Sequence, residues 1–240
     1  MLLHGDLATN ATWAGQVDAL AENFRVIAPE RRGQGHTPDV EGPVSYQVMA
    51  EDTIGFIDKV IGEPVHLIGH SGGGVVGLLI ARARPDLVRK QVLIGTPADT
   101  EGYIPGFMEF TRLPADSDVY QPFRAAYEAA SPDGPGHWPV VFAKQMKMWQ
   151  TEPHIPLTGL AAVGARTLVM VGDDDLVTAE HAIAIYRAIP NAELSVIPGA
   201  SHMAPMEKPE LVNRLLLDFL LHDASPTLMP IRRAAAPAHT

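Results

Sequence analysis

The sequence contains no cysteine, and this absence excludes several kinds of chemistry together. Without thiols there is no disulfide, no thiolate metal ligand and no cysteine nucleophile. Basic residues are also scarce, since 18 lysines and arginines stand against 28 aspartates and glutamates, for a formal net charge of -10. This excess of negative charge repels phosphate backbones and anionic lipid surfaces. We therefore expect neither a nucleic acid nor a membrane as the partner.

Long apolar runs are absent as well. No run approaches the roughly 18 apolar residues that cross a bilayer. The segment that begins at Met1 lacks the basic start and the cleavage site of a signal peptide. We therefore expect a cytoplasmic protein. Apolar residues still make up 46% of the 240 residues, which suffices for the core of one α/β domain with a modest insertion.

Short apolar runs alternate with helical patterns through most of the chain, which is typical of an α/β fold with a mostly parallel sheet and helices on both faces. The runs are nearly continuous, as expected for strands that are buried on both sides. The predicted strands are Met1–Leu3, Arg25–Ala28, Val65–Ile68, Gln91–Ile94, Thr167–Val171 and Glu193–Ile197. The predicted helices are Thr12–Glu22, Tyr46–Val60, Gly74–Ala83, Ala179–Ala188 and Pro209–Leu221.

This alternation stops between Asp99 and Gly164, where prolines are frequent and no strand pattern is visible. We expect residues 1–98 and 165–222 to form the α/β core and residues 99–164 to form a helical cap over the sheet. Large side chains of this insertion either line a pocket beneath it or, for most of them, form its own core: Trp138, Phe142, Met146, Met148 and Trp149. Residues 223–240, rich in alanine, proline and arginine, are expected to be disordered.

The segment Gly69-His70-Ser71-Gly72-Gly73 lies between a predicted strand and a predicted helix, which is the context that a G-x-S-x-G nucleophile motif requires. A turn this sharp needs strained backbone angles and small residues on both sides of the serine. It exposes the hydroxyl of Ser71 and puts the amide of Gly72 at a helix N-terminus, where it can stabilise an oxyanion. A glycine-rich turn that merely packs tightly or holds a phosphate is the alternative, although no Gly-Lys-Ser/Thr follows to form a phosphate loop.

A serine hydroxyl becomes a good nucleophile only when a neighbouring base takes its proton. His202 is the predicted base, because it lies in the loop between the last strand and the last helix. A solvated loop histidine is the alternative. Three other histidines precede or adjoin Ser71 and fit the role poorly: His4, His36 and His70. His66 and His70 have the spacing of a zinc pair but lie on a strand and a turn, so we predict no metal site.

Three consecutive aspartates, Asp173 to Asp175, are candidates for the acid that would orient this histidine. We choose Asp175, because the apolar residues that follow it turn back into the core and Thr178 can cap the next helix. Asp173 and Asp174 fit better as solvated loop charges. Asp99, after the fourth predicted strand, stays open as a less favoured acid.

Together these motifs resemble the α/β-hydrolase fold superfamily, in its group of small capped single-domain serine hydrolases. His4-Gly5 followed by Trp13 resembles the oxyanion loop and first helix, and Arg25 to Thr37 resembles the strand and the Arg-Gly-x-Gly-x-Ser/Thr turn after it. The elbow, the Gly172–Asp175 segment and Ser201-His202 complete the pattern in the same chain order. The resemblance covers about Met1 to Leu221, with only the insertion unmatched.

The resemblance implies that Asp6 gives its backbone N–H to the oxyanion hole beside Gly72. Members usually carry an apolar residue there, so an acidic side chain at the pocket mouth disfavours anionic substrates. Relatives that open epoxides or remove halide carry aspartate as the nucleophile, and Ser71 argues against both reactions. The resemblance also implies that no cofactor is needed. Members normally carry two further strands before the loop at His4-Gly5, so we expect a stub of a strand at Met1–Leu3, unpaired backbone groups beside it, and a true start of the protein upstream.

The predicted function is hydrolysis of an ester, a lactone or a related acyl bond in a small molecule with an apolar acyl or alkyl group. The reaction would pass through an acyl-enzyme on Ser71, with Asp175 and His202 completing a catalytic triad. A C–C bond hydrolase or a cofactor-free perhydrolase with the same triad is the alternative within this fold. A ligand-binding receptor on a hydrolase scaffold is the alternative that is not an enzyme.

Overall fold

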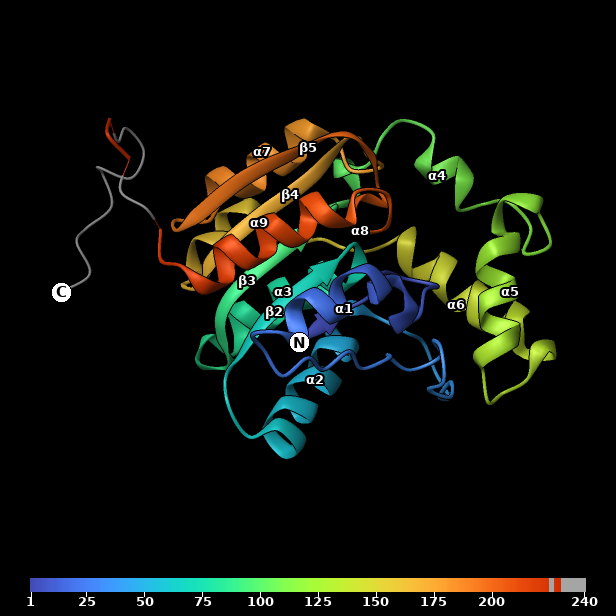
Figure 1. The fold of residues 1–240 in the computed structure, drawn as a ribbon. Coiled ribbons are helices and arrows are strands. Elements are labelled where there is room, and N and C mark those ends of the chain that lie inside the picture. Colours follow the sequence, from blue (N-terminus) through green and yellow to red (C-terminus); the bar gives the residue numbers. More distant parts are fainter. Residues whose placement is uncertain (225–226, 230–240) are drawn as a thin grey trace.

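The computed structural model describes residues 1–224 and 227–229. Its sheet has five parallel strands in the order β1-β2-β3-β4-β5. Figure 1 labels β2 to β5 of this sheet. The strands are β1 (Leu2–Leu3), β2 (Val65–His70), β3 (Val88–Ile94), β4 (Arg166–Asp174) and β5 (Ala192–Ser201). The helices are α1 (Ala14–Ala21), α2 (Tyr46–Phe56), α3 (Gly72–Ala83), α4 (Phe107–Phe110), α5 (Gln121–Ala130), α6 (Trp138–Trp149), α7 (Ala179–Ala188), α8 (Ala204–Glu207) and α9 (Pro209–Leu221). The predicted α/β fold with a parallel sheet is confirmed.

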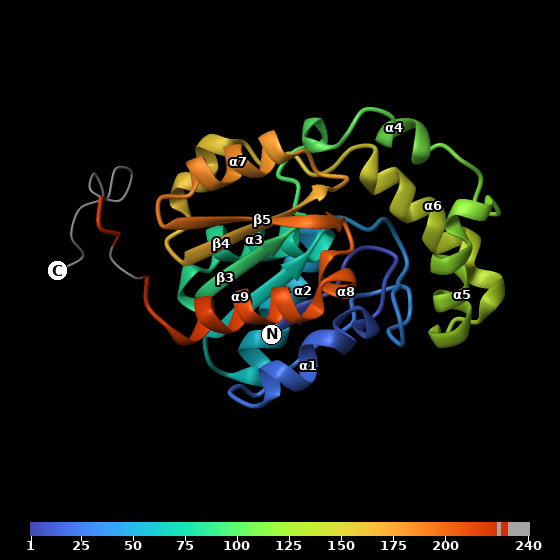
Figure 2. The same ribbon diagram turned by 45° about the horizontal axis from the view of Figure 1, so that its top comes forward.

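Neighbouring residues of each strand pack into two separate cores. Leu67 of β2 and Leu93 of β3 lie in the core that also holds buried residues of α2, α3 and α7. Ile68 and Val92, the adjacent residues, lie in the core with α1 and α9. Figure 2 shows α1 and α9 on one side of the sheet and α7 on the other. Because side chains alternate between the faces of a strand, both faces need apolar residues, which explains the continuous apolar runs in the sequence.

The predicted strand at Arg25–Ala28 is wrong. This segment has no regular secondary structure and joins no strand ladder in the described residues, and its side chains are partly or fully exposed. Its neighbour β1 is only two residues long, and the amide of Leu2 donates to the carbonyl of Ile27 at 2.8 Å. A neighbour this short cannot supply the run of paired groups that makes a ladder. The other predicted strands all coincide with or overlap observed ones, and α7 and α9 have the predicted bounds.

Residues 99–164, hereafter the insertion, carry α4, α5 and α6 together with short 3-10 turns, and none of the sheet's strands lies in this described stretch. Figures 1 and 2 show α5 and α6 side by side at one end of the molecule. Buried aromatic rings join these helices, since Trp138 packs against Tyr127 and Phe142, and Phe142 against Tyr120. Trp138 and Phe142 therefore pack among aromatic rings of the insertion, and these rings are continuous with the core that holds Leu67 and Leu93.

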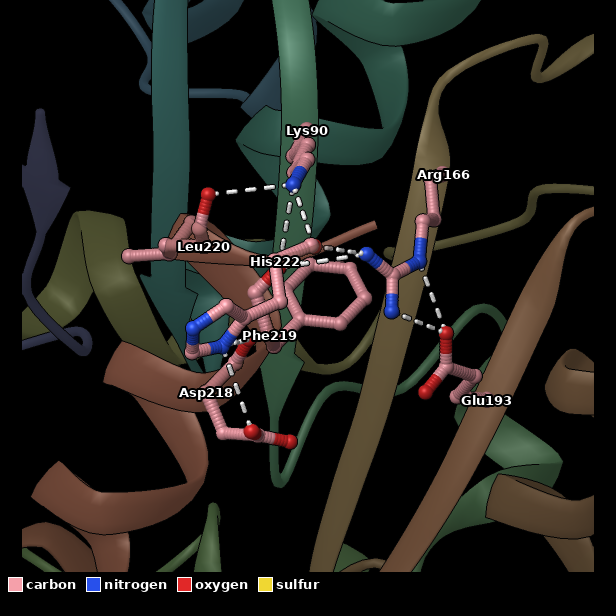
Figure 3. A network of polar contacts seen from close by, with 7 residues as sticks. All are labelled: Lys90, Arg166, Glu193, Asp218, Phe219, Leu220 and His222. Carbon is pink, nitrogen blue, oxygen red and sulfur yellow. Dashed lines mark hydrogen bonds and ion pairs between the residues drawn. The ribbon is translucent and has the colours of Figure 1, made fainter. Parts of the chain in front are cut away.

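A cluster of polar contacts fixes the end of α9 at the amino ends of β3 and β4 (Figure 3). The ammonium of Lys90 donates to the carbonyls of Phe219, Leu220 and His222 at 3.2, 3.0 and 2.8 Å. Arg166 donates to the carbonyl of His222 at 2.6 Å and stacks over the ring of Phe219 at 4.4 Å. Cations at a helix C-terminus satisfy its free carbonyls and its dipole. We refer to Lys90 and Arg166 as the α9 anchor.

Two expectations concern membranes and the end of the chain. No helix in the described part of the chain is long and apolar enough to cross a membrane. The disorder expected for residues 223–240 falls mostly on positions outside the described residues.

Candidate active site

Ser71 lies at the junction of β2 and α3 with backbone angles φ 52° and ψ -123°. A side chain rarely adopts a positive φ, and holding one there costs on the order of 1–3 kcal/mol. The flanking glycines are required by space, because a Cβ on Gly69 would lie 2.5 Å from the carbonyl oxygen of Gly73, and one on Gly73 would lie 2.2 Å from that of Leu3. The predicted sharp elbow at Ser71 is therefore present.

His202 and Asp175 form a hydrogen-bonded pair in the candidate site. The Nδ1 atom of His202 lies 2.6 Å from Oδ1 of Asp175, whose side chain is only 1% exposed. The carboxylate also accepts the amides of Gly172 at 3.2 Å and Val177 at 3.0 Å. Burial raises the pKa of Asp175, but the hydrogen bond and charge of His202 and the two amides outweigh it, so this pKa lies below its ordinary value. Asp175 thus stays ionised and orients the imidazole.

The competing carboxylates lie apart from His202. Asp173 and Asp174 are exposed, as expected for loop charges, although Oδ1 of Asp173 also accepts the amide of Ala200 at 3.1 Å. Asp99 caps a short 3-10 turn and pairs with Nδ1 of His154 at 2.9 Å. The structure therefore brings Asp175, and none of the other three, to the histidine.

Two residues beside the pair have roles that the sequence alone did not reveal. Gly95, directly after β3, has φ 52°, and a Cβ there would lie 2.8 Å from Nδ1 of His202. The amide of Ser71 donates to the carbonyl of Ile94 at 2.8 Å, so the elbow and the imidazole meet at the end of β3. The position of Gly95, directly after a predicted buried strand, is the sequence signal that could have identified it.

His70 is the second such residue. Its Nε2 donates to the backbone carbonyl of His202 at 2.7 Å, and the two rings lie 4.8 Å apart. Burial lowers the pKa of His70 to about 3, so the ring is neutral. His70 therefore ties the elbow to the loop of the candidate base. In the described residues, no group of three or more His, Cys, Asp or Glu side chains could hold a metal ion.

The loop after β1 passes directly beside the elbow. A Cβ on Gly5 would lie 3.5 Å from Cβ of Ser71, and one on Gly72 would lie 2.2 Å from Oδ2 of Asp6. The structure thus brings Asp6 and Gly72 together, as the resemblance implied. The expected acidic side chain at the pocket mouth is wrong, however, because the Asp6 side chain is 1% exposed and pairs with Arg31 at 3.1 Å.

Aromatic side chains from the insertion adjoin this loop. Trp149 donates its indole N–H to Oδ2 of Asp6 at 2.9 Å, and its ring lies 5.8 Å from that of Phe107. Phe107 stacks on Tyr103 at 3.8 Å. Trp149 therefore differs from Trp138, because it reaches the elbow region. An open cavity of about 300 Å³ lies elsewhere, between α2 and the segment from Pro29 to Val40.

Comparisons with known proteins show which family the chain resembles over most of its length. The profile described as "Alpha/beta hydrolase family" matches residues 1–215. A curated relative from Agrobacterium fabrum, named "Putative carbamate hydrolase RutD", is 26% identical over 92% of each chain. The 2-hydroxymuconate semialdehyde hydrolase of Pseudomonas sp. is 26% identical, over 92% of this chain and 86% of the relative. A solved thermophilic esterase from Thermogutta terrifontis has a TM-score of 0.73 and 26% identity, over 92% of this chain and 88% of that one.

Proposed function

Because the chain belongs to the alpha/beta hydrolase family, we propose that it hydrolyses an ester or a related acyl bond of a small molecule through an acyl-enzyme on Ser71. Hydrolase activity is the general function that the named relatives support. The observation that carries the finer proposal is the strained elbow of Ser71 beside an imidazole that a buried carboxylate orients. No member of the proposed triad is missing, which argues against a receptor on this scaffold.

The proposed reaction uses the two ring nitrogens of His202 for different tasks. Nδ1 donates to Asp175, so Nε2 is the nitrogen that takes the proton of the Ser71 hydroxyl. The serine oxygen then attacks the carbonyl carbon, and the oxyanion accepts the backbone N–H groups of Gly72 and Asp6. The imidazolium returns its proton to the leaving alcohol. Water, deprotonated by the same histidine, then hydrolyses the acyl-enzyme and regenerates Ser71.

Esters and lactones are the proposed substrates, with an acyl or alkyl group that is apolar. Tyr103, Phe107 and Trp149 support this proposal, because their rings adjoin the loop at Asp6. The similarity to the Thermogutta esterase favours the same class. A C–C bond hydrolase is the second candidate, favoured by the similarity to the semialdehyde hydrolase over nearly the whole chain. A carbamate substrate is a third, favoured in the same way.

A substrate panel separates these candidates. Purified protein is assayed with p-nitrophenyl esters of increasing acyl length, a lactone, an aryl carbamate and a ring-cleavage product, each beside Ser71→Ala. We expect turnover of short esters that disappears in the variant, and a fluorophosphonate adduct on the Ser71 peptide of the wild type. Turnover of the ring-cleavage product alone would transfer the proposal to C–C cleavage. An adduct or turnover that persists in Ser71→Ala would contradict the mechanism.

A further inference from the structure

Side chains from three separate parts of the fold hold the carboxylate of Asp6, two by hydrogen bonds and one by an ion pair. Tyr46 of α2 donates its hydroxyl to Oδ2 at 2.6 Å, and Trp149 of α6 donates its indole N–H to the same oxygen at 2.9 Å. Arg31 lies 3.1 Å from Oδ1. Burial and the charge of Asp6 raise the pKa of Tyr46, so the phenol keeps the proton that it donates. A buried carboxylate needs such partners, because leaving it unpaired costs several kcal/mol.

Arg31 also fixes the backbone of the same loop. Its Nη2, the atom nearest Asp6, donates to the carbonyl of His4 at 2.9 Å. The ring of His4 in turn donates through Nδ1 to the carbonyl of Gly5 at 2.7 Å. The loop from His4 to Asp6 is therefore tied through its backbone at one end and through a side chain at the other. Rotation of this loop would break several buried polar contacts at once.

The position of the carboxylate explains why this matters for catalysis. Oδ2 of Asp6 would lie 2.2 Å from a Cβ on Gly72, so the side chain is packed against the residue after the nucleophile. In the proposed function the amides of these two residues receive the oxyanion together. Oxyanion donors act only when they already point at the place where charge develops. Contacts that fix the side chain of Asp6 therefore also fix the direction of its N–H.

We propose that Asp6 is a positioning residue, and that the hydrogen bond from Trp149 lets the insertion set the geometry of the oxyanion hole. An apolar side chain at this position could not accept the indole N–H. Arg31 offsets the negative charge that Asp6 would otherwise place beside a developing oxyanion. The insertion thereby contributes to the rate of the reaction as well as to the choice of substrate. The inference rests on the proposed acyl-enzyme mechanism at Ser71.

The test removes the donors one at a time and keeps an aromatic ring at each position. Trp149→Phe and Tyr46→Phe are compared with Trp138→Phe, which loses an indole hydrogen bond at the other end of the same helix, to the carbonyl of Ala115. We expect Trp149→Phe to lower kcat roughly tenfold on a short and a long ester alike, less than the about 10²–10³ lost when an oxyanion donor is removed outright. KM should stay nearly constant, and Trp138→Phe should stay within about twofold of the wild type.

Binding of a trifluoromethyl ketone, whose adduct with a serine carries an oxyanion, separates positioning from packing. We expect its inhibition constant to rise in Trp149→Phe and Tyr46→Phe by the same factor as kcat falls, with the pH profile of kcat unchanged. The melting temperature should fall in these two variants and in Trp138→Phe, because each loses a buried or partly buried hydrogen bond, but only the first two should bind the inhibitor more weakly. An unchanged inhibition constant, a change confined to KM or to chain-length preference, or equal losses in Trp138→Phe would overturn the proposal. If Trp149→Phe does not fold, Tyr46→Phe alone decides. Activity that persists in Ser71→Ala would instead contradict the proposed function on which this inference rests.

Discussion

Polar groups at the two ends of the parallel sheet have different surroundings. At the amino ends of the strands, Lys90 and Arg166 donate to the free carbonyls of α9, and Arg166 also pairs with Glu193 at 2.6 Å (Figure 3). At the carboxyl ends, Ser71 has a strained backbone, and buried nitrogens of Arg31 and His70 find no hydrogen-bond partner among the described residues. Polar groups at the first end stabilise a helix terminus, whereas the second end holds backbone strain of the kind that clusters at functional sites. Buried nitrogens without a partner occur at both ends, since Nδ1 of His66 in β2 also lacks one among the described residues.

This comparison predicts that substitutions at the carboxyl end change rate more than stability, and that those at the amino end do the reverse. The largest effect should come from Ser71→Ala. We expect kcat to fall by about 10⁴-fold or more with KM little changed, because the nucleophile is lost while binding contacts remain. Steady-state kinetics on an aryl ester measure this, and the melting temperature should stay close to that of the wild type. Full activity in Ser71→Ala would contradict the assignment of Ser71 as the nucleophile, and with it the expected contrast between the two ends of the sheet.

Asp175→Asn should give the next largest loss. The amide cannot stabilise the imidazolium and favours the wrong tautomer, so we expect kcat to fall by roughly 10³–10⁴. Asp173→Asn and Asp99→Asn are the matched controls, because each removes a carboxylate that lies apart from His202, and both should retain most of the activity. A fall in kcat of this size in Asp99→Asn would show that the acid has been assigned to the wrong residue.

Acid should destabilise the carboxyl end, where two buried neutral histidines lie. Burial lowers the pKa of both His4 and His70 to about 3. Below pH 6.5 the unfolded chain binds protons that the folded chain does not, so stability falls as the pH decreases. We expect the free energy of unfolding to drop for each histidine as the pH falls from 6.5 to 5, with a slope that approaches roughly 1.4 kcal/mol per pH unit at the lower end. Urea unfolding at several pH values measures the slope.

His70→Phe provides the control for this pH dependence, because it removes one of several histidine rings whose pKa burial lowers, His4 and His66 among them, while keeping an aromatic side chain. The slope should become shallower by about one histidine's share, roughly 1.4 kcal/mol per pH unit. The lowered pKa of Asp175 acts in the same direction but at lower pH, since its stabilisation is present above the unfolded pKa and is lost as the pH falls through the folded one. Stability that is flat between pH 6.5 and 5 would contradict the assigned neutral state.

The smallest effect is expected at the α9 anchor. Lys90→Met keeps the length of the side chain but removes the cation, and we expect a loss of about 1–2 kcal/mol in the free energy of unfolding with kcat unchanged. Arg84→Met is the matched control, because Arg84 pairs with Asp58 and Asp86 on the surface, where ion pairs contribute little. A loss of activity in Lys90→Met, at unchanged stability, would mean that the two ends of the sheet are coupled.

Local features of the chain determined much of this structure. The spacing of glycines around Ser71 requires a strand, a sharp turn and a helix, because only residues without a Cβ fit beside the elbow. Thr178 was predicted to cap α7, and its hydroxyl accepts the amide of His181 at 3.3 Å. Pro209 begins α9, where its missing N–H costs nothing. Each of these choices depends on backbone geometry within a few residues, so the sequence by itself decided them.

Contacts between distant segments were decided only by the tertiary structure. The donors that surround Asp6 include Tyr46 and Trp149, which lie 40 and 143 residues further along the chain. The bond from His70 to the carbonyl of His202 joins residues 132 positions apart. The apolar run at Arg25–Ala28 predicts a strand, but its neighbour β1 is too short to pair with it. A local sequence pattern indicates which secondary structure a segment prefers. The partners of a buried polar group depend instead on how separate elements pack against one another.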